Sequence, residues 1–283
     1  MSTKPAAQPS SIGCSKRIAF VGGLHRSGTT VFARALSLHP QVAGLSLTNV
    51  PMDEGQHLQS VYPPARELGG PGVFGFSSDA HITEQSPLVS PSALEKLLNA
   101  WRPYWDMTKP VLLEKSPPNL LRMRFLQALF PRARFVVVVR HPVPVALATQ
   151  RWTAISTESV VRHWGLCHRL LLDDLPYVRA LRIVRYEDIV AAPAHMLVEI
   201  LSFLGLEGET DVTGIKPGRS ERYFIRWAAD GRRIDSATAQ TAALFGYDVR
   251  HPWDHSHVSP EVAALQHVMV RRDSRSRPMS LDT

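Results

Sequence analysis

The sequence has few cysteines and no long apolar segment, and each of these features excludes a class of protein. Its two cysteines, Cys14 and Cys167, lie far apart, and the first falls in a polar stretch. We therefore expect no structural disulfide, as is usual in the reducing cytoplasm. The apolar runs are too short to cross a bilayer, and the first residues lack the apolar centre of a signal peptide. We expect a cytoplasmic protein without a membrane anchor.

The sequence also lacks internal repeats, and its 283 residues are enough for one sizeable α/β domain. The polar ends predict disordered tails over residues 1–16 and 273–283. We expect a single domain over residues 17–272. Within it, residues 44–103 are irregular and rich in turn signals, which predicts an insertion that faces a substrate.

Motifs of nucleic-acid-binding proteins are absent, although the formal net charge is +7. The positive residues are scattered, and no recognition helix, RNA-binding motif or zinc finger is visible. His251, His255 and His257 have a spacing that can bind zinc, but no helix or strand pattern frames them. We expect a solvated loop there, no metal site and no nucleic-acid partner.

The most informative stretch is an apolar run, residues 17–23, that ends in glycines and leads into the Arg-Ser-Gly-Thr-Thr sequence of residues 26–30. Apolar residues at helical spacing follow, so the pattern predicts a strand, a loop and a helix N-terminus. The first amides of a helix lack partners and carry partial positive charge. Glycine lets the backbone approach a ligand, and the hydroxyls and the arginine add donors. We therefore predict a site for a phosphate-bearing ligand.

Gly23 and Gly28 have the spacing of a P-loop, but Thr29 stands where a P-loop NTPase needs lysine. Thr30 would still be able to ligate Mg²⁺, so a divergent P-loop small-molecule kinase stays open as one alternative. A non-catalytic protein that binds a nucleotide or a polyanion is another.

Three further apolar runs predict strands of the same sheet. They are residues 111–115, 135–140 and 183–186, which end at Lys115, Arg140 and Tyr186. The valine run before Arg140 is typical of a strand buried on both faces. Open parallel sheets bind ligands beyond the carboxyl ends of their strands. Because a buried arginine is costly without a partner, Arg140 also indicates a bound anion or a carboxylate.

These four segments, in this order, resemble the sulfotransferases that use 3′-phosphoadenosine 5′-phosphosulfate (PAPS). Residues 26–30 resemble the family's 5′-phosphosulfate loop, and Lys115 lies in a Lys-x-Pro segment like that of the bacterial and tyrosylprotein branches. The resemblance implies an α/β fold, with a mostly parallel sheet flanked by helices. It also implies metal-free transfer of the sulfuryl group of PAPS to a hydroxyl or amine of a small-molecule acceptor, with release of 3′-phosphoadenosine 5′-phosphate (PAP).

The resemblance also implies roles for individual residues. Arg26 and Lys115 would hold the sulfuryl oxygens and the leaving group, Arg140 the 3′-phosphate, and Tyr186 would lie near adenine. The other expected contacts to PAPS are His25, Ser27, Gly28, Thr29, Thr30, Thr149, Lys216 and Arg219. For the last two, which flank a Pro-Gly pair, a surface turn is the alternative.

Two positions depart from the family pattern. Ala148 stands where a serine normally helps to bind the 3′-phosphate, and we consider its neighbour Thr149 as a substitute. Val31 stands where the cytosolic branch has a tryptophan that stacks on adenine, so another residue must cover the base. We consider for that role Tyr223, Phe224 and Trp227.

The base that accepts the acceptor's proton is expected just beyond the first helix, where related enzymes carry Glu or His. The chain offers Asp53, Glu54 and His57 there. We favour Glu54, then His57, then Asp53. The alternative for either carboxylate is an ordinary loop residue in water.

Overall fold

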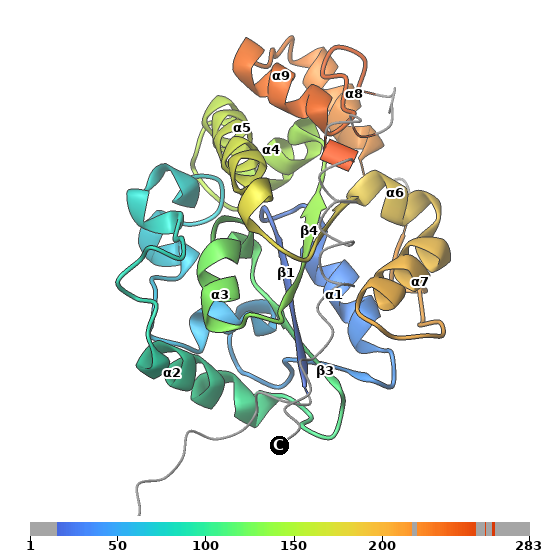
Figure 1. Ribbon diagram of the computed structural model, residues 1–283. Helices are drawn as coiled ribbons and strands as arrows, with labels where there is room; N and C mark the ends of the chain where they lie inside the picture. The colour runs from blue at the N-terminus through green and yellow to red at the C-terminus, as the bar shows by residue number, and fades with distance from the viewer. Residues whose placement is uncertain (1–15, 217–219, 253–257, 259–261, 264–283) are drawn as a thin grey trace, which may run out of the picture.

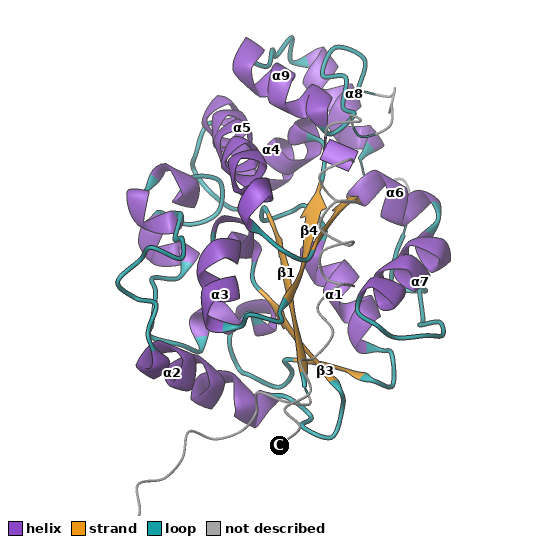
Figure 2. Ribbon diagram, viewed as in Figure 1, coloured by secondary structure: helices purple, strands orange, loops and turns teal. Residues whose placement is uncertain are grey.

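A five-stranded sheet, in which all strands are parallel, forms the centre of the protein. The computed structural model describes residues 16–216, 220–252, 258 and 262–263. The strands are β1 Arg17–Gly23, β2 Val42–Gly44, β3 Val111–Lys115, β4 Arg134–Val139 and β5 Leu181–Arg185. Their order across the sheet is β2-β3-β1-β4-β5. The expected α/β fold, a parallel sheet flanked by helices, is confirmed (Figures 1 and 2).

Helices connect the strands and follow the last one. In the described chain they are α1 Thr29–Ser37, α2 Pro91–Trp101, α3 Met123–Leu129, α4 Pro142–Gln150, α5 Thr157–Asp174, α6 Tyr186–Ala191, α7 Pro193–Phe203, α8 Glu221–Ala229 and α9 Ser236–Leu244. The sequence predicts helices at residues 94–101 and near residues 219–227, which overlap α2 and α8, but it misses α9. A further helix, expected at residues 259–270, falls almost entirely outside the described residues, as do the two expected tails.

Apolar packing covers both faces of the sheet. Successive side chains of a strand point to opposite sides, so each strand contributes residues to both cores. On one face, Phe20 and Phe135 join an apolar core with α2, α3 and α5. On the other face, Val21 and Val136 pack against α1 and α7. Figure 1 shows α1, α6 and α7 on one side of the sheet and α2 and α3 on the other. This two-sided burial explains why the strands are almost wholly apolar.

Residues 44–103 consist mainly of loops and short 3₁₀ turns before α2, as their irregular sequence suggests. The segment packs against α5, where the amide of Gly75 donates a hydrogen bond to Nε2 of His163 at 2.9 Å. It also carries residues 54–57 back to the sheet, where the amide of Gln56 donates to Ser116 just beyond β3. The insertion therefore contributes directly to the carboxyl edge of the sheet.

That edge is where the predicted site residues gather. β1 is the central strand: the chain crosses from it to β2 and β3 on one side and later to β4 and β5 on the other. Such a switch point leaves a crevice beyond the carboxyl ends of the strands. Val21 pairs with Lys115, and Gly23 pairs with Val138, so the ends of β1, β3 and β4 lie side by side.

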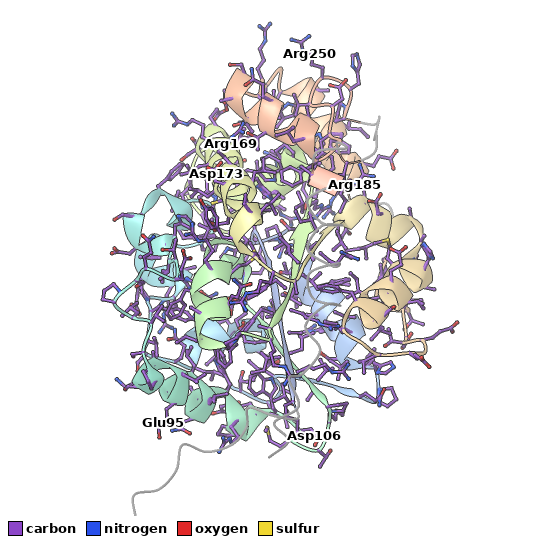
Figure 3. The ribbon with its side chains drawn as sticks, viewed as in Figure 1. Glu95, Asp106, Arg169, Asp173, Arg185 and Arg250 are labelled. Carbon is purple, nitrogen blue, oxygen red and sulfur yellow. The ribbon has the colours of Figure 1, made fainter. Side chains whose placement is uncertain are left out.

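Charged side chains such as Glu95, Asp106 and Arg250 are exposed at the periphery of the molecule (Figure 3). In the described part of the chain, none of the helices combines the length and the apolar character that crossing a bilayer requires.

Candidate active site

The loop between β1 and α1 is shaped for an anion. Gly28 precedes α1 with a φ of 99°, and an added Cβ would lie 2.5 Å from the ring of Tyr186, so only glycine fits there. None of the described side chains caps α1, which leaves the amides of its first turn for a ligand. The buried Ser27 hydroxyl also lacks a partner among the described residues. Thr29 is buried in the same loop, and Thr30 is half-buried.

Arg26 occupies a strained position in this loop. Its φ is 71°, a left-handed conformation that is rare for residues other than glycine. Its backbone carbonyl accepts a hydrogen bond from Nη1 of Arg140 at 3.0 Å. Its own side chain is exposed, with the guanidinium 4.9 Å from the ring centre of Trp152. The backbone of Arg26 therefore contacts the side chain of Arg140, whereas the Arg26 guanidinium lies at the solvent-exposed rim of the site.

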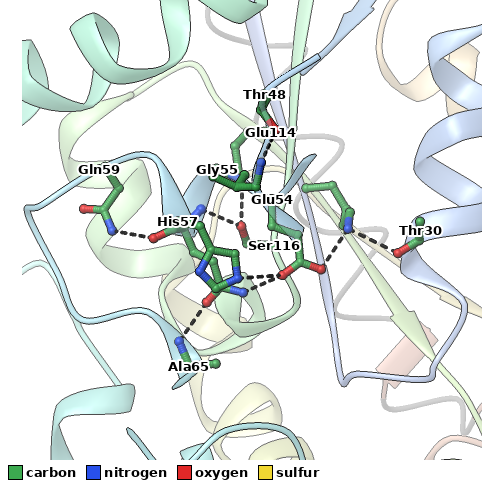
Figure 4. Close-up of polar contacts among 12 residues, drawn as sticks. Thr30, Thr48, Glu54, Gly55, His57, Gln59, Ala65, Glu114 and Ser116 are labelled. Carbon is green, nitrogen blue, oxygen red and sulfur yellow. Dashed lines mark hydrogen bonds and ion pairs between the residues drawn. The ribbon is translucent and has the colours of Figure 1, made fainter. Parts of the chain in front are cut away.

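A buried ion pair lies beside the loop. Nζ of Lys115, at the end of β3, lies 2.9 Å from Oε1 of Glu54 and donates to the Thr30 hydroxyl at 3.2 Å (Figure 4). Lys115 is 5% and Glu54 6% exposed, so each needs the other for charge compensation. Two predicted catalytic residues thus meet at the first turn of α1, although 61 positions separate them in the sequence.

Several buried hydrogen bonds hold Glu54 in place. Oε2 of Glu54 accepts from the amide side chain of Gln56 at 2.6 Å. The neighbouring carboxylate of Glu114 accepts from the amide of Gly55 and the hydroxyl of Ser116 (Figure 4). It also accepts from the side chain of Asn119. Burial raises the pKa of Glu114, although these bonds partly offset the effect. No sequence pattern predicts this support, because Glu114 looks like an ordinary residue near the end of an apolar strand.

The loop that leads to Glu54 is strained. Apart from Arg26, the described non-glycine residues with positive φ are all in this loop: Leu47, Asn49, Met52 and Asp53. Oδ1 of Asp53 accepts from the amide and the hydroxyl of Thr48, at 3.1 and 2.6 Å. Asp53 therefore stabilises the loop, whereas Glu54 points to Lys115. Strained backbone of this kind is concentrated at functional sites.

Two histidines lie close to the ion pair. Nε2 of His57 is 3.7 Å from Oε2 of Glu54, and its pKa is lowered by burial, although Glu54 acts in the opposite direction. Burial also lowers the pKa of His25 to about 4, again with Glu54 opposing. His25 contacts Phe74 edge-on, and Nδ1 of each histidine lacks a hydrogen-bond partner among the described residues. Both imidazole rings are neutral at pH 7, and the Nδ1 atom of each is able to form a hydrogen bond with a ligand.

Arg140 directly follows β4 as a buried cation and is 6% exposed. Its Nη2 donates to the hydroxyl of Ser220 at 2.8 Å, and its guanidinium lies 4.1 Å from the ring centre of Tyr186. Burial lowers its pKa, its Nε has no partner, and no carboxylate pairs with it in the described chain. Glu187 acts on Arg140 electrostatically without an ion pair among the described residues, which leaves the guanidinium available to an anionic ligand.

A small surface hollow opens beside Gly28. Its walls include Val31, Tyr186, Ile215 and Lys216. It is not lined by the three aromatic residues considered above as covers for the adenine base, Tyr223, Phe224 and Trp227. These residues pack instead with α4 and α5. Arg219 lies outside the described residues.

The structure does not bring Thr149 to Arg140. Thr149 is buried, with its methyl group near Gly72. The hydroxyl that contacts Arg140 belongs to Ser220, which precedes α8, and the sequence pattern gave no signal for it.

Comparison with known proteins agrees with this arrangement. Residues 19–211 match the sulfotransferase family. The fold is similar to the sulfotransferase domain of the olefin synthase from Synechococcus PCC 7002, with a TM-score of 0.52 and 20% identity over 86% of this chain and 98% of that one. It is also similar to the sulfotransferase domain from the curacin biosynthetic pathway, with a TM-score of 0.50 and 16% identity over 82% and 98%. No curated protein matches the sequence. The family match and the shared fold show that this chain is an enzyme of the sulfotransferase family.

Proposed function

We propose that this enzyme transfers the sulfuryl group of PAPS to a hydroxyl of a small-molecule acceptor. The observation that carries the proposal is the buried pair of Lys115 and Glu54, which touches Thr30 in the first turn of an uncapped helix. A cation, a proton acceptor and free amides thus converge on one point. Sulfuryl transfer needs all three, because charge develops on the leaving oxygen while the acceptor loses a proton.

The donor would lie across the carboxyl edge of the sheet. Its 5′-phosphosulfate fits the loop at residues 26–30, where the first amides of α1 and the Ser27 hydroxyl have no side-chain partner among the described residues. Its 3′-phosphate fits Arg140, a buried cation that lacks a carboxylate partner in the described chain. Its base would lie against the small hollow lined by Tyr186, Ile215 and Lys216. Arg26, at the rim, would add charge near the sulfuryl group.

In the reaction, the acceptor oxygen bonds to sulfur as the bond from sulfur to the bridging phosphate oxygen breaks. Lys115 stabilises the charge that develops on that bridging oxygen, together with the amides of the first turn of α1. Glu54 takes the proton of the acceptor hydroxyl, and PAP leaves. Since Oε1 of Glu54 is bonded to Lys115 in the free enzyme, donor binding must draw Lys115 toward the new anion and release that oxygen.

Two measurements on the full chain test this proposal. Calorimetry is expected to detect PAP binding, with ATP bound more weakly. Incubation with PAPS labelled in its sulfate, and a panel of alcohols, phenols and amines, is expected to give a labelled product. Absence of PAP binding would refute the proposal. Phosphate transfer from ATP would favour the kinase alternative, and PAP binding without transfer to any acceptor would favour a non-catalytic nucleotide-binding protein.

A further inference from the structure

Exposed aromatic side chains lie at the rim of the candidate active site. Trp152 is 65% exposed, and the centre of its ring lies 4.9 Å from the Arg26 guanidinium. Phe76, on a short 3₁₀ turn of the insertion, is exposed as well. A Cβ added to Gly72, just before this turn, would lie 3.0 Å from the methyl group of Thr149, and the amide of Trp152 donates to the Thr149 carbonyl at 2.9 Å. The segments that carry the two rings are therefore neighbours.

The turn that carries Phe76 also packs against the loop between β1 and α1. Phe74, in the same turn, contacts His25 edge-on, with 5.6 Å between the ring centres. Besides burial, the charges of Glu54 and Lys115 act on the pKa of His25, so this histidine lies close to the ion pair. The exposed rings thus border the place where the reaction is proposed to occur.

The strained loop before Glu54 adds two more exposed apolar side chains. Leu47 is 89% exposed, and Met52 is exposed too. Their φ values, 56° and 55°, are left-handed. Met52 lines the same small hollow as Thr30 and Lys115. The backbone therefore adopts an unfavourable conformation that leaves apolar side chains in water, and strain of this kind is concentrated at functional sites.

A single exposed apolar residue needs no explanation, but several gathered at one opening indicate a binding surface. These four side chains come from three separate segments and border the same ion pair, and they are Leu47, Met52, Phe76 and Trp152. An apolar ligand would remove their surface, and its own, from water. A ligand that is polar throughout, such as a sugar, would gain nothing from them.

We propose that the acceptor is an alcohol with an extended apolar body, which lies against Trp152, Phe76 and Met52 while its hydroxyl faces Glu54. The inference rests on the proposed function, because it names the class of acceptor for that reaction. The alcohol oxygen bonds to sulfur as the bond to the bridging phosphate oxygen breaks, and the proton goes to Glu54. The products are PAP and an amphiphile, a sulfate monoester with an apolar tail.

The test measures kcat/KM for sulfation of linear primary alcohols, from butanol to octanol, by the full-length enzyme with labelled PAPS. Sorbitol, which offers more hydroxyls but no apolar body, is the polar comparison. We expect kcat/KM to rise about two- to threefold for each added methylene, because each one leaves water on binding. Sorbitol is expected to give little product.

Two variants assign this preference to the rim. Trp152→Ala is expected to lower kcat/KM for octanol about tenfold and that for butanol less than about twofold. Because Trp152 contacts Arg26, the butanol rate reports any indirect effect through that arginine. Met52→Asn removes an apolar contact but relieves strain, since asparagine tolerates a left-handed conformation. It is expected to weaken the preference for octanol about threefold and to raise Tm, whereas a merely structural role of Met52 predicts a lower Tm.

Tyr177→Ala is the matched control. Tyr177 is also an exposed aromatic residue beside an arginine, 4.1 Å from the Arg124 guanidinium, but it precedes β5 and lies away from the carboxyl edge. It is expected to leave the preference for octanol unchanged.

Calorimetry with PAP separates failure of this inference from failure of the proposed function. A wild type that binds PAP but sulfates butanol and octanol equally, sulfates only sorbitol, or sulfates none of the alcohols would overturn the inference about the acceptor. An octanol preference that survives both rim variants would overturn it as well. A wild type that binds no PAP would instead overturn the proposed function itself.

Discussion

Replacing Glu54 with glutamine is the sharpest test of the catalytic arrangement. The change keeps the size and shape of the side chain, and the remaining carbonyl oxygen can still accept from Lys115, now 2.9 Å from Oε1. It removes the only property that the mechanism requires, the ability to take a proton. A positioned general base contributes about 100- to 10,000-fold to a rate, or about 3–5 kcal/mol of barrier. We expect Glu54→Gln to slow the chemical step by a factor in this range.

The same structure predicts a smaller cost in stability. In the variant, Lys115 faces a neutral amide instead of a carboxylate, and the new amide group lies against the donating side chain of Gln56. Removing one partner of a buried ion pair costs about 3–5 kcal/mol when nothing replaces it. Because the amide oxygen and Thr30 still accept from Lys115, we expect a loss of about 1–3 kcal/mol, which the domain can tolerate.

The assay is a single turnover with excess enzyme and labelled PAPS, which reports the chemical step rather than product release. PAP affinity, measured by calorimetry, is expected to change by less than about threefold. Glu67→Gln is the matched control, because Glu67 is an exposed carboxylate whose charge reaches His57. A Glu54→Gln enzyme that keeps near-normal single-turnover rates would refute the assignment and make His57 the base to test next.

Three other predictions follow from buried or strained groups. Gly28→Ala forces a Cβ at a φ of 99° against an aromatic ring, so we expect thermal denaturation to show a loss of about 1–3 kcal/mol and calorimetry to show weaker PAP binding. Gly70→Ala has a φ of 86° but nothing within 4 Å of its Cβ, and it is expected to leave PAP binding unchanged. Glu114→Gln replaces one accepting oxygen with an amide nitrogen, which then faces either Asn119 or the pair Gly55 and Ser116, all of them donors, so we expect turnover to fall with PAP affinity retained; unchanged turnover would contradict this role. Burial lowers the pKa of His163 to about 3 and that of His168 to about 4, so below pH 6.5 the unfolded chain binds protons that the folded chain does not. Stability is therefore complete above pH 6.5 and falls toward pH 4, by about 2 kcal/mol per histidine at pH 5, and urea denaturation that gives equal stability at pH 7 and pH 5 would contradict this.

The sequence predicted the parts of the site that follow directly from a strand. Lys115 and Arg140 come at or just after the ends of apolar runs, and the loop at residues 26–30 joins such a run to a periodic helix. In a parallel sheet the carboxyl ends of all strands share one edge, so the order of segments along the chain was enough to place these residues together. The fold class and the strand, loop and helix at residues 17–37 could be predicted for the same reason.

The positions of site residues that lie in irregular segments could not be predicted in this way. Glu54 was a favoured base, but its contact with Lys115, and the separation of Asp53 into a loop contact with Thr48, depend on how the strained loop at residues 47–53 folds. In the sequence Glu114 is an ordinary strand residue, and only the fold shows that it accepts a hydrogen bond from the amide of Gly55. No periodicity encodes such contacts.

The sequence by itself thus determined the parallel sheet, the glycine-rich anion loop and the two cations at the strand ends, because each depends on a local pattern and on the direction of a strand. Tertiary structure alone decided which carboxylate pairs with Lys115 and which hydroxyl contacts Arg140. Glu54 and Ser220 are brought to the sheet by loops and by a helix far along the chain, and the contacts that hold them there are interactions between segments that share no sequence pattern.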